Sequence, residues 1–168
     1  MITIRQYNQD EDAVKVGILI ADTYSEFNLD FASSSELPLL LGPFRHARST
    51  DKEHRQQIAR MVHSEIVLVA EDGEEIIGVL RGRKERLGSL FVRKDYHRQG
   101  VGRSLVQQFE RKCIENGSTI IRVASTLFAV PFYEALGYKK STGVRNGWSF
   151  EGQGLRIQPM KKKLGSPD

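Results

Sequence analysis

Residues 90–104 read LFVRKDYHRQGVGRS, and this stretch sets the architecture of the chain. Leu90, Phe91 and Val92 are β-formers that predict the end of a strand. From Gly100 onward, the apolar residues recur at helical spacing until the stop signal at 116–117: Val101, Leu105, Val106, Phe109 and Cys113. We therefore expect a strand, a polar turn over 93–99 and a helix that begins at a glycine.

The start of this helix is suited to binding an anion. Gly100 and Gly102 leave the main chain open to close approach, since neither carries a Cβ. The first turn of a helix also has N–H groups without acceptors and a partial positive charge, which together favour phosphate. His97, Arg98 and Arg103 add side-chain donors or charge around it.

Three phosphate-binding motifs resemble this stretch to different degrees. A dinucleotide fingerprint requires a third glycine where Leu105 stands, and a P-loop requires glycine at His97 and lysine at Arg103. The third motif is the pyrophosphate loop of the GNAT superfamily of N-acetyltransferases, Q/R-x-x-G-x-G/A. The sequence HRQGVG at 97–102 resembles it except at His97. Taken alone, the stretch is also compatible with a helix start that a glycine merely caps.

A second segment, AVPFYEALGY at 129–138, resembles a later GNAT motif, A-x-x-F-Y-x-x-x-G-F/Y. It follows a β-branched run at 119–125 that predicts a buried strand. Phe132 and Tyr133 fall on one helix face and could be ordinary core aromatics. Both motifs in order, joined by one helix and one strand, favour the GNAT resemblance, which covers roughly residues 66–164.

The composition is that of one globular domain. With 39% hydrophobic and 27% charged residues, the 168-residue chain can bury a single core, which we place at residues 1–164, followed by a flexible C-terminal tail at 165–168. The net charge of +4 suits an anionic cofactor as well as nucleic acid. Cys113 is expected in the core, no spacing indicates a metal site, and no signal peptide or membrane span is evident, so we expect a cytoplasmic protein.

The first third of the chain is expected to hold one strand and two helices. Residues 2–7 alternate as a half-buried strand does. Asn8 with Glu11, and Thr50 with Glu53, each resemble a capping box, the signature of a helix start.

Residues 28–49, between these helices, carry an apolar run bounded by Pro38 and Pro43. Such a run is not expected to form a regular helix interior. It could wall a substrate pocket, contact a partner subunit in a homodimer or fill the core.

The remaining strands are expected at 66–71, 76–83, 88–92, 119–125, 138–144 and 155–162. Asp72-Gly73 and Asn146-Gly147 are the expected hairpin turns, and the helix before 119–125 implies a parallel crossover. The fold class is therefore α/β: a single GNAT-like domain with a central mixed, mostly antiparallel twisted sheet of about seven strands and helices on both faces. The element order is β-α-α-β-β-β-α-β-α-β-β.

The resemblance implies that the co-substrate is acetyl-CoA. Its pyrophosphate would bind the main chain at 98–103, and its pantetheine would run along the strand ending at Val92, where that strand parts from 119–125. A nearby main-chain N–H would polarise the thioester carbonyl. The cofactor-binding residues expected are Leu90, Phe91, Val92, His97, Arg98, Gln99, Gly100, Val101, Gly102, Arg103, Ser104, Thr126 and Phe132.

Two residues are candidates for catalysis. The resemblance implies that Tyr133 donates a proton to the departing thiolate, and a phenol with a pKa of about 10 is protonated at neutral pH. Many family members carry a glutamate base four residues before the leucine of the cofactor strand. That position is Arg86 here, and Glu85 is adjacent. The base is therefore Glu85, a water chain or a group from 28–49.

Four basic residues lie close together before this strand: Arg81, Arg83, Lys84 and Arg86. They could be solvated charges at a strand edge, which also prevent aggregation. They could instead attract an acidic substrate or the ribose phosphate of the coenzyme.

The function expected is acetyl transfer from acetyl-CoA to an amine by direct attack in a ternary complex. The acceptor is a small-molecule or peptide amine whose identity the sequence does not give. Two other functions stay open: a non-catalytic acetyl-CoA-binding regulator and a basic nucleic-acid-binding module. The scattered basic residues and the lack of a nucleic-acid motif disfavour the module.

Overall fold

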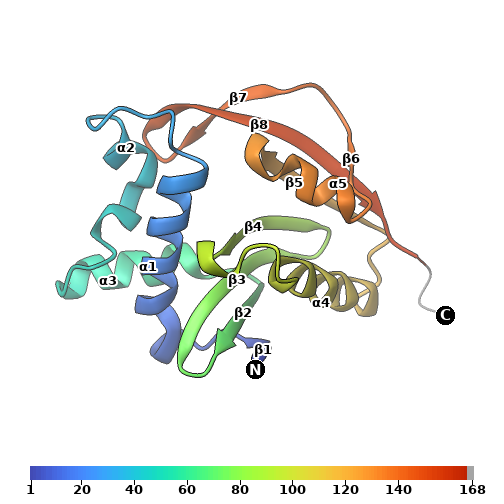
Figure 1. Cartoon of the computed structure of the whole chain (residues 1–168), viewed down its shortest axis with the longest axis horizontal. Coiled ribbons are helices and arrows are strands. Elements are labelled where there is room, and N and C mark those ends of the chain that lie inside the picture. The colour runs from blue at the N-terminus through green and yellow to red at the C-terminus, as the bar shows by residue number, and fades with distance from the viewer. Residues whose placement is uncertain (166–168) are drawn as a thin grey trace.

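The strand and helix expected on either side of residues 93–99 form the centre of the computed structural model, which describes residues 1–165 (Figure 1). Strand β4 (Arg86–Val92) leads through the 3₁₀ turn η2 (Lys94–Tyr96) to α4 (Val101–Glu115). Gly100 is the N-cap of α4, with a φ of 81°, a left-handed conformation that glycine adopts without strain. Of the expected tail, residues 166–168 lie outside the described residues.

The sheet has the strand order β1-β2-β3-β4-β5-β8-β6, and β7 also pairs with β8. The other strands are β1 (Ile2–Gln6), β2 (Ile66–Asp72), β3 (Glu75–Arg83), β5 (Ile120–Thr126), β6 (Lys139–Lys140), β7 (Arg145–Ser149) and β8 (Gly152–Lys163). Within residues 1–165, only β4 and β5 run parallel and the sheet has eight strands rather than about seven, so the mixed, mostly antiparallel sheet is confirmed.

The parallel pair of β4 and β5 is short. It consists of Arg86 opposite Arg122 and Leu87 opposite Val123, after which the two strands part (Figure 1). The antiparallel ladders of β3 with β4 and of β5 with β8 continue past this point. The sheet is therefore divided at its centre, beyond Leu87.

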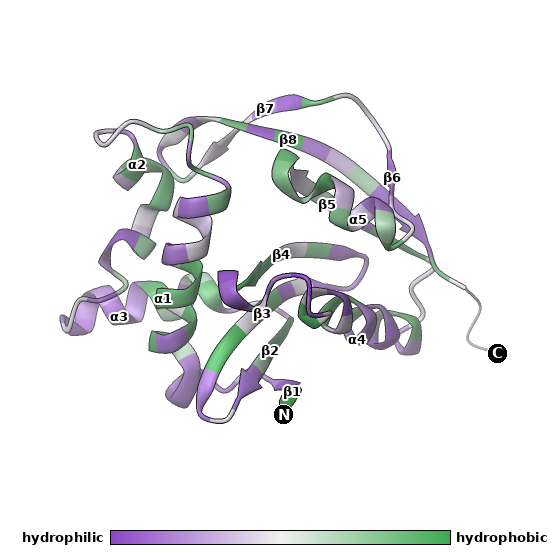
Figure 2. Ribbon diagram, viewed as in Figure 1, coloured by the Kyte–Doolittle hydropathy of each residue, from purple (hydrophilic) through white to green (hydrophobic). Residues whose placement is uncertain are grey.

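Helices cover both faces of the sheet, as expected. One face carries α1 (Gln9–Phe27), α2 (Leu37–Leu41), the 3₁₀ helix η1 (Gly42–His46) and α3 (Lys52–Val62), and their buried residues form one core cluster with β2 and β3. The other face carries α4 and α5 (Val130–Ala135), which form a second cluster. Figure 2 shows α3 as mainly hydrophilic, in keeping with the two residues that it buries, Ile58 and Val62.

The two expected helix caps differ in detail from the structure. Asn8 caps α1 by accepting from the N–H of Asp10, but its own N–H donates to Asp12 rather than to Glu11. Asp51, not Thr50, caps α3, and its carboxylate accepts from the N–H of Glu53 at 2.8 Å. A carboxylate next to the helix start replaces the hydroxyl, because it also interacts favourably with the helix dipole.

Two expectations for irregular or turn segments are wrong. The apolar run in 28–49 forms the short helices α2 and η1, because Pro38 and Pro43 lie in their first turns, where no N–H is required. Asn146-Gly147 lies within β7 rather than in a turn, and the hairpin to β8 turns at Phe150 and Glu151. The strand expected at 138–144 is accordingly reduced to β6.

Candidate functional site

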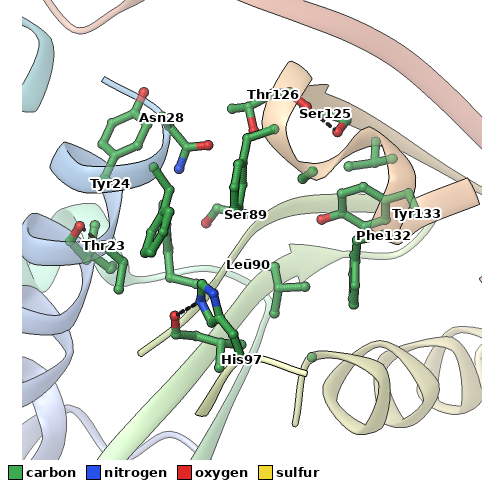
Figure 3. Close-up of a pocket in the computed structure, with 18 of the residues that line it drawn as sticks. Thr23, Tyr24, Asn28, Ser89, Leu90, His97, Ser125, Thr126, Phe132 and Tyr133 are labelled. Carbon is green, nitrogen blue, oxygen red and sulfur yellow. Dashed lines mark hydrogen bonds between the residues drawn. The ribbon is translucent and has the colours of Figure 1, made fainter. Parts of the chain in front are cut away.

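A cavity of about 980 Å³ lies where β4 and β5 part. Its walls come from the C-terminal half of α1, the ends of β4 and β5, and the starts of α4 and α5 (Figure 3). A ligand in this cavity would therefore lie between the two halves of the sheet.

The edge of β4 that faces the cavity has main-chain groups without strand partners. The N–H of Arg93 donates to Ile77 of β3, so by the alternation of an antiparallel ladder the N–H and C=O groups of Leu90 and Val92 point away from β3. The main chain of Phe91 pairs with β3 instead, and its ring packs edge-on against Tyr24, with centroids 5.6 Å apart. Of the three residues expected to offer main-chain groups, two therefore do so.

The start of α4 forms one end of the cavity. The N–H groups of Val101, Gly102 and Arg103 have no acceptor within the described part of the chain, as expected for a first helical turn. Arg98 also has a left-handed φ, of 62°, and lines the cavity together with Arg103. A Cβ at Gly100 would meet nothing within 4 Å, so the main chain there is open to a ligand.

Three residues of this loop contribute differently from what was expected. A Cβ at Gly102 would lie 3.0 Å from the ring of Phe132, so this glycine allows α4 and α5 to pack closely rather than making room for a ligand. Gln99 donates from its side chain to the carbonyl of Asp95, and the N–H of Ser104 bonds to the carbonyl of Gly100. Neither Gln99 nor Ser104 lines the cavity, although Thr126 and Phe132 do.

His97, which stands in place of the motif's glutamine or arginine, links the loop before α4 to the end of β4 by a hydrogen bond. Its Nε2 donates to the carbonyl of Val92 at 2.7 Å, because a carbonyl oxygen can only accept. Its ring packs against Phe27, which in turn stacks on Phe128, with ring centroids 4.8 and 5.1 Å apart. These three rings come from α1, the loop before α4 and the segment after β5, so they join the two halves of the sheet.

Tyr133 lies on α5 with its hydroxyl directed into the cavity (Figure 3). The residue is 4% exposed, and no hydrogen bond to its hydroxyl is present in the described part of the chain. Burial raises the pKa of the phenol above its ordinary value. Tyr133 is therefore a neutral hydrogen-bond donor at physiological pH, with an unused proton.

Glu85 is not brought to the cavity. It lies in the turn between β3 and β4 with a φ of 70°, is exposed, and accepts a main-chain hydrogen bond from Arg122. The turn directs it to solvent at the far end of the hairpin. The group of four basic residues is also divided: Arg83, Lys84 and Arg86 are exposed, whereas Arg81 lines the cavity.

The opposite wall holds polar groups that the motifs did not indicate. The hydroxyl of Tyr24 on α1 lies 2.6 Å from Oγ of Ser149, which donates to the carbonyl of Leu40. Burial raises the pKa of Tyr24. No sequence signal connects Tyr24 to Ser149 of β7, which lies 125 residues away.

Residues 1–165 contain no group of three or more His, Cys, Asp or Glu side chains arranged to hold a metal ion. Within the same residues, no helix combines the length and apolar character needed to cross a membrane.

Comparison with known proteins finds one family and many similar folds. Residues 23–164 match the family model described as an acetyltransferase (GNAT) domain. A GCN5-related N-acetyltransferase from Rhodopseudomonas palustris superposes with a TM-score of 0.76 at 20% identity, over 96% of this chain and 95% of that one. The PaiA N-acetyltransferase from Thermoplasma acidophilum, solved with coenzyme A, gives 0.72 at 16% identity over 98% and 99%. YncA from Salmonella typhimurium, a putative acetyltransferase solved with acetyl-CoA, gives 0.64 at 15% identity over 100% and 98%.

Proposed function

The chain belongs to the GNAT family of acetyltransferases, and from this premise we propose that it transfers an acetyl group from acetyl-CoA to an amine. The observation that carries the proposal is the hydroxyl of Tyr133, which has no hydrogen-bond partner among residues 1–165 and points into the cavity whose opposite wall includes the unpaired edge of β4 (Figure 3).

The residues of the cavity fit acetyl-CoA along its length. The first turn of α4, with the free N–H groups of Val101, Gly102 and Arg103, would hold the pyrophosphate. The main-chain N–H and C=O of Leu90 and the N–H of Val92 would bind the amides of the pantetheine, which would pair with β4 as a neighbouring strand does; the carbonyl of Val92 already accepts from His97. This placement supports the thioester lying near Tyr133, deep in the cavity.

The reaction forms a bond between the amine nitrogen and the acetyl carbon and breaks the bond between that carbon and sulfur. The amine loses one proton and the departing thiolate gains one. Tyr133 supplies the proton that the thiolate gains, or donates a hydrogen bond to the sulfur. After donating a proton, it recovers one from solvent. The protein's main contribution is to hold the two reactants together, which removes much of the entropic cost of a bimolecular step.

Within residues 1–165, no carboxylate is placed to accept the proton of the amine. Among the described residues that line the cavity, none is Asp or Glu, and Glu85 lies outside it. The amine would therefore lose its proton to water, helped by desolvation and by nearby positive charge, both of which lower the pKa of a bound ammonium group. Accordingly, we expect Glu85→Gln to keep wild-type kcat and KM, measured by release of coenzyme A.

A panel of amines tests the proposal, with free coenzyme A as the readout. The panel contains a peptide N-terminus, a lysine side chain, a polyamine, an amino acid and an aminoglycoside. Coenzyme A released in proportion to one acceptor supports acetyl transfer. Tight binding of acetyl-CoA without release for any acceptor would contradict it and would indicate a regulator.

A further inference from the structure

The cavity carries positive charge, although an amine acceptor is itself mostly protonated at neutral pH and would add more. Its described lining residues include three arginines, Arg81, Arg98 and Arg103, and the imidazole of His97, but no Asp, Glu or Lys. Arg98 and Arg103 flank the start of α4, where a pyrophosphate would neutralise them. Arg81 is left without such a partner.

Arg81 lies apart from the anion-binding end of the cavity. It lies on β3 opposite Ser89. Ser89 precedes Val92 by three residues, so Arg81 lies about 10 Å along the sheet from the end of β4 that leads to the anion site. It faces the side of the sheet covered by α1 and α3, whose core cluster includes Val62, the last residue of α3. Its charge is therefore not needed for the pyrophosphate.

The guanidinium of Arg81 is partly buried and has no acidic partner among residues 1–165. Nε donates to the carbonyl of Val62 at 2.8 Å, Nη2 to that of His63 at 3.3 Å, and Nη1 lies 3.4 Å from Oγ of Ser89. No ion pair links Arg81 to any carboxylate of residues 1–165. Burial lowers the pKa of Arg81, as it does for a charged group without a counter-ion.

Three of the five N–H groups of the guanidinium are thus used, and two are free to bind a ligand. A carboxylate is the group that matches this charge and geometry best, since arginine binds carboxylates through parallel hydrogen bonds. The walls on the same side of the cavity are apolar, from Ile20, Phe44, Phe91 and Leu155.

Building on the acetyltransferase function proposed above, we propose that the acceptor is an amino-acid-like amine, with a carboxylate that binds Arg81 and an apolar side chain that packs on these walls. A polyamine or an aminoglycoside would bring several positive charges into a cavity with no Asp or Glu among its described lining residues. An amino acid brings its own negative charge and compensates Arg81. Its amine forms the new bond to the acetyl carbon and releases its proton to water, while the thiolate takes the proton from Tyr133.

The test compares acceptors that differ only in the carboxylate: leucine, leucinamide and isoamylamine, with spermidine as a cationic acceptor. Each is assayed with the wild type, Arg81→Gln, Arg81→Lys and the control Arg83→Gln, an exposed arginine of the same strand. For the wild type we expect leucine to be preferred to isoamylamine in kcat/KM. In Arg81→Gln, leucine should lose about 10- to 100-fold, the range for hydrogen bonds to a charged group, chiefly through KM.

The other acceptors should change little in Arg81→Gln, and Arg83→Gln should behave as the wild type. Arg81→Lys keeps the charge but loses the paired hydrogen bonds, so leucine should fall by an intermediate factor. Binding of leucine in the presence of coenzyme A, measured by calorimetry, should weaken from the wild type to Arg81→Lys and further to Arg81→Gln. This measurement does not depend on turnover.

Two results would overturn the inference while leaving the proposed function intact. One is turnover of spermidine in preference to leucine by the wild type. The other is an equal loss for all acceptors in Arg81→Gln with a lower melting temperature, which would show that Arg81 only caps α3. No turnover of any acceptor would refute the proposed function, and this inference with it.

Discussion

Replacing Tyr133 by phenylalanine tests the role of its hydroxyl in the reaction without disturbing the packing of the ring. The hydroxyl has no hydrogen-bond partner among residues 1–165, so its removal leaves no buried group unsatisfied. The ring keeps its packing against Phe132 and Tyr138, with centroids 5.1 and 5.5 Å apart. We therefore expect the free energy of unfolding to change by less than about 0.5 kcal/mol.

The effect on the rate follows from what the hydroxyl would stabilise. A hydrogen bond to a charged group contributes about 1.5–3 kcal/mol, and each 1.36 kcal/mol is about tenfold in rate. A thiol with a pKa of about 8.5 is already a good leaving group, so the lower part of this range applies. Tyr133→Phe should reduce kcat by about 10- to 50-fold, with acetyl-CoA affinity nearly unchanged.

Tyr138→Phe is the matched control in the same core. The hydroxyl of Tyr138 donates to Glu110 at 3.1 Å and does not line the cavity, so its loss should reduce stability and leave kcat unchanged. The assay is steady-state release of coenzyme A with one confirmed amine, together with urea unfolding of both variants. Wild-type kcat in Tyr133→Phe, with chemistry shown to limit the rate, would remove Tyr133 from the mechanism.

Three further predictions concern the anion site, the acceptor wall and the N-terminal ion pair. Gly100→Val should abolish acetyl-CoA binding in calorimetry, whereas Gly73→Val, which has a similarly left-handed φ in the β2–β3 turn, should lose comparable stability but bind normally; equal binding in both would refute the pyrophosphate site. Phe44→Leu should change the ranking of acceptors, while Leu40→Ala, at a fully buried residue outside the cavity, should lower the free energy of unfolding by about 2–5 kcal/mol without changing that ranking. Burial opposes ionisation of Asp12, but hydrogen bonds from Arg5 at 2.7 and 2.9 Å lower its pKa, so its stabilisation is present above the unfolded value of about 3.9 and is lost as the pH falls through the folded value. Asp12→Asn should accordingly cost about 1–3 kcal/mol at pH 7, and urea unfolding at about pH 3 should show a smaller difference from the wild type.

The central part of the fold could be predicted from sequence because its signals are local. A strand that changes to helical spacing at Gly100, and a second motif over residues 129–138, fix β4, α4, β5 and α5 in order. These signals also placed Tyr133 and the start of α4 at one cavity, because the strand-parting arrangement belongs to the family that both motifs resemble.

The errors arise where a residue has a role that depends on distant contacts. Gly147 resembles a turn residue, but it lies in β7, where a Cβ would meet the end of the Ile157 side chain at 2.6 Å, so the glycine leaves room for this side chain of β8. The turn itself uses Phe150, which adopts a φ of 54°, and its ring covers Gly42 of η1. No local pattern reveals a phenylalanine in that conformation, since the contact that stabilises it comes from a segment more than 100 residues earlier.

In the candidate site, too, local signals could be predicted from sequence and roles that depend on distant contacts could not. Main-chain groups at Leu90 and Val92 follow from the strand pattern, whereas the exclusion of Glu85 depends on the turn that points it to solvent. Arg81 and Arg83 lie on the same face of β3. Only Arg81 is partly buried, because two main-chain carbonyls at the end of α3 accept hydrogen bonds from it, and this contact forms only in the assembled fold.

Mass spectrometry of the products tests the central claim most directly. Purified protein is incubated with acetyl-CoA and the amine panel, and each acceptor is examined for a gain of one acetyl group on nitrogen. We predict one acetylated acceptor, formed in equal amount to free coenzyme A, and its loss in Gly100→Val but not in Gly73→Val. Acetyl-CoA that binds to the wild type without any acetylated product would contradict the account.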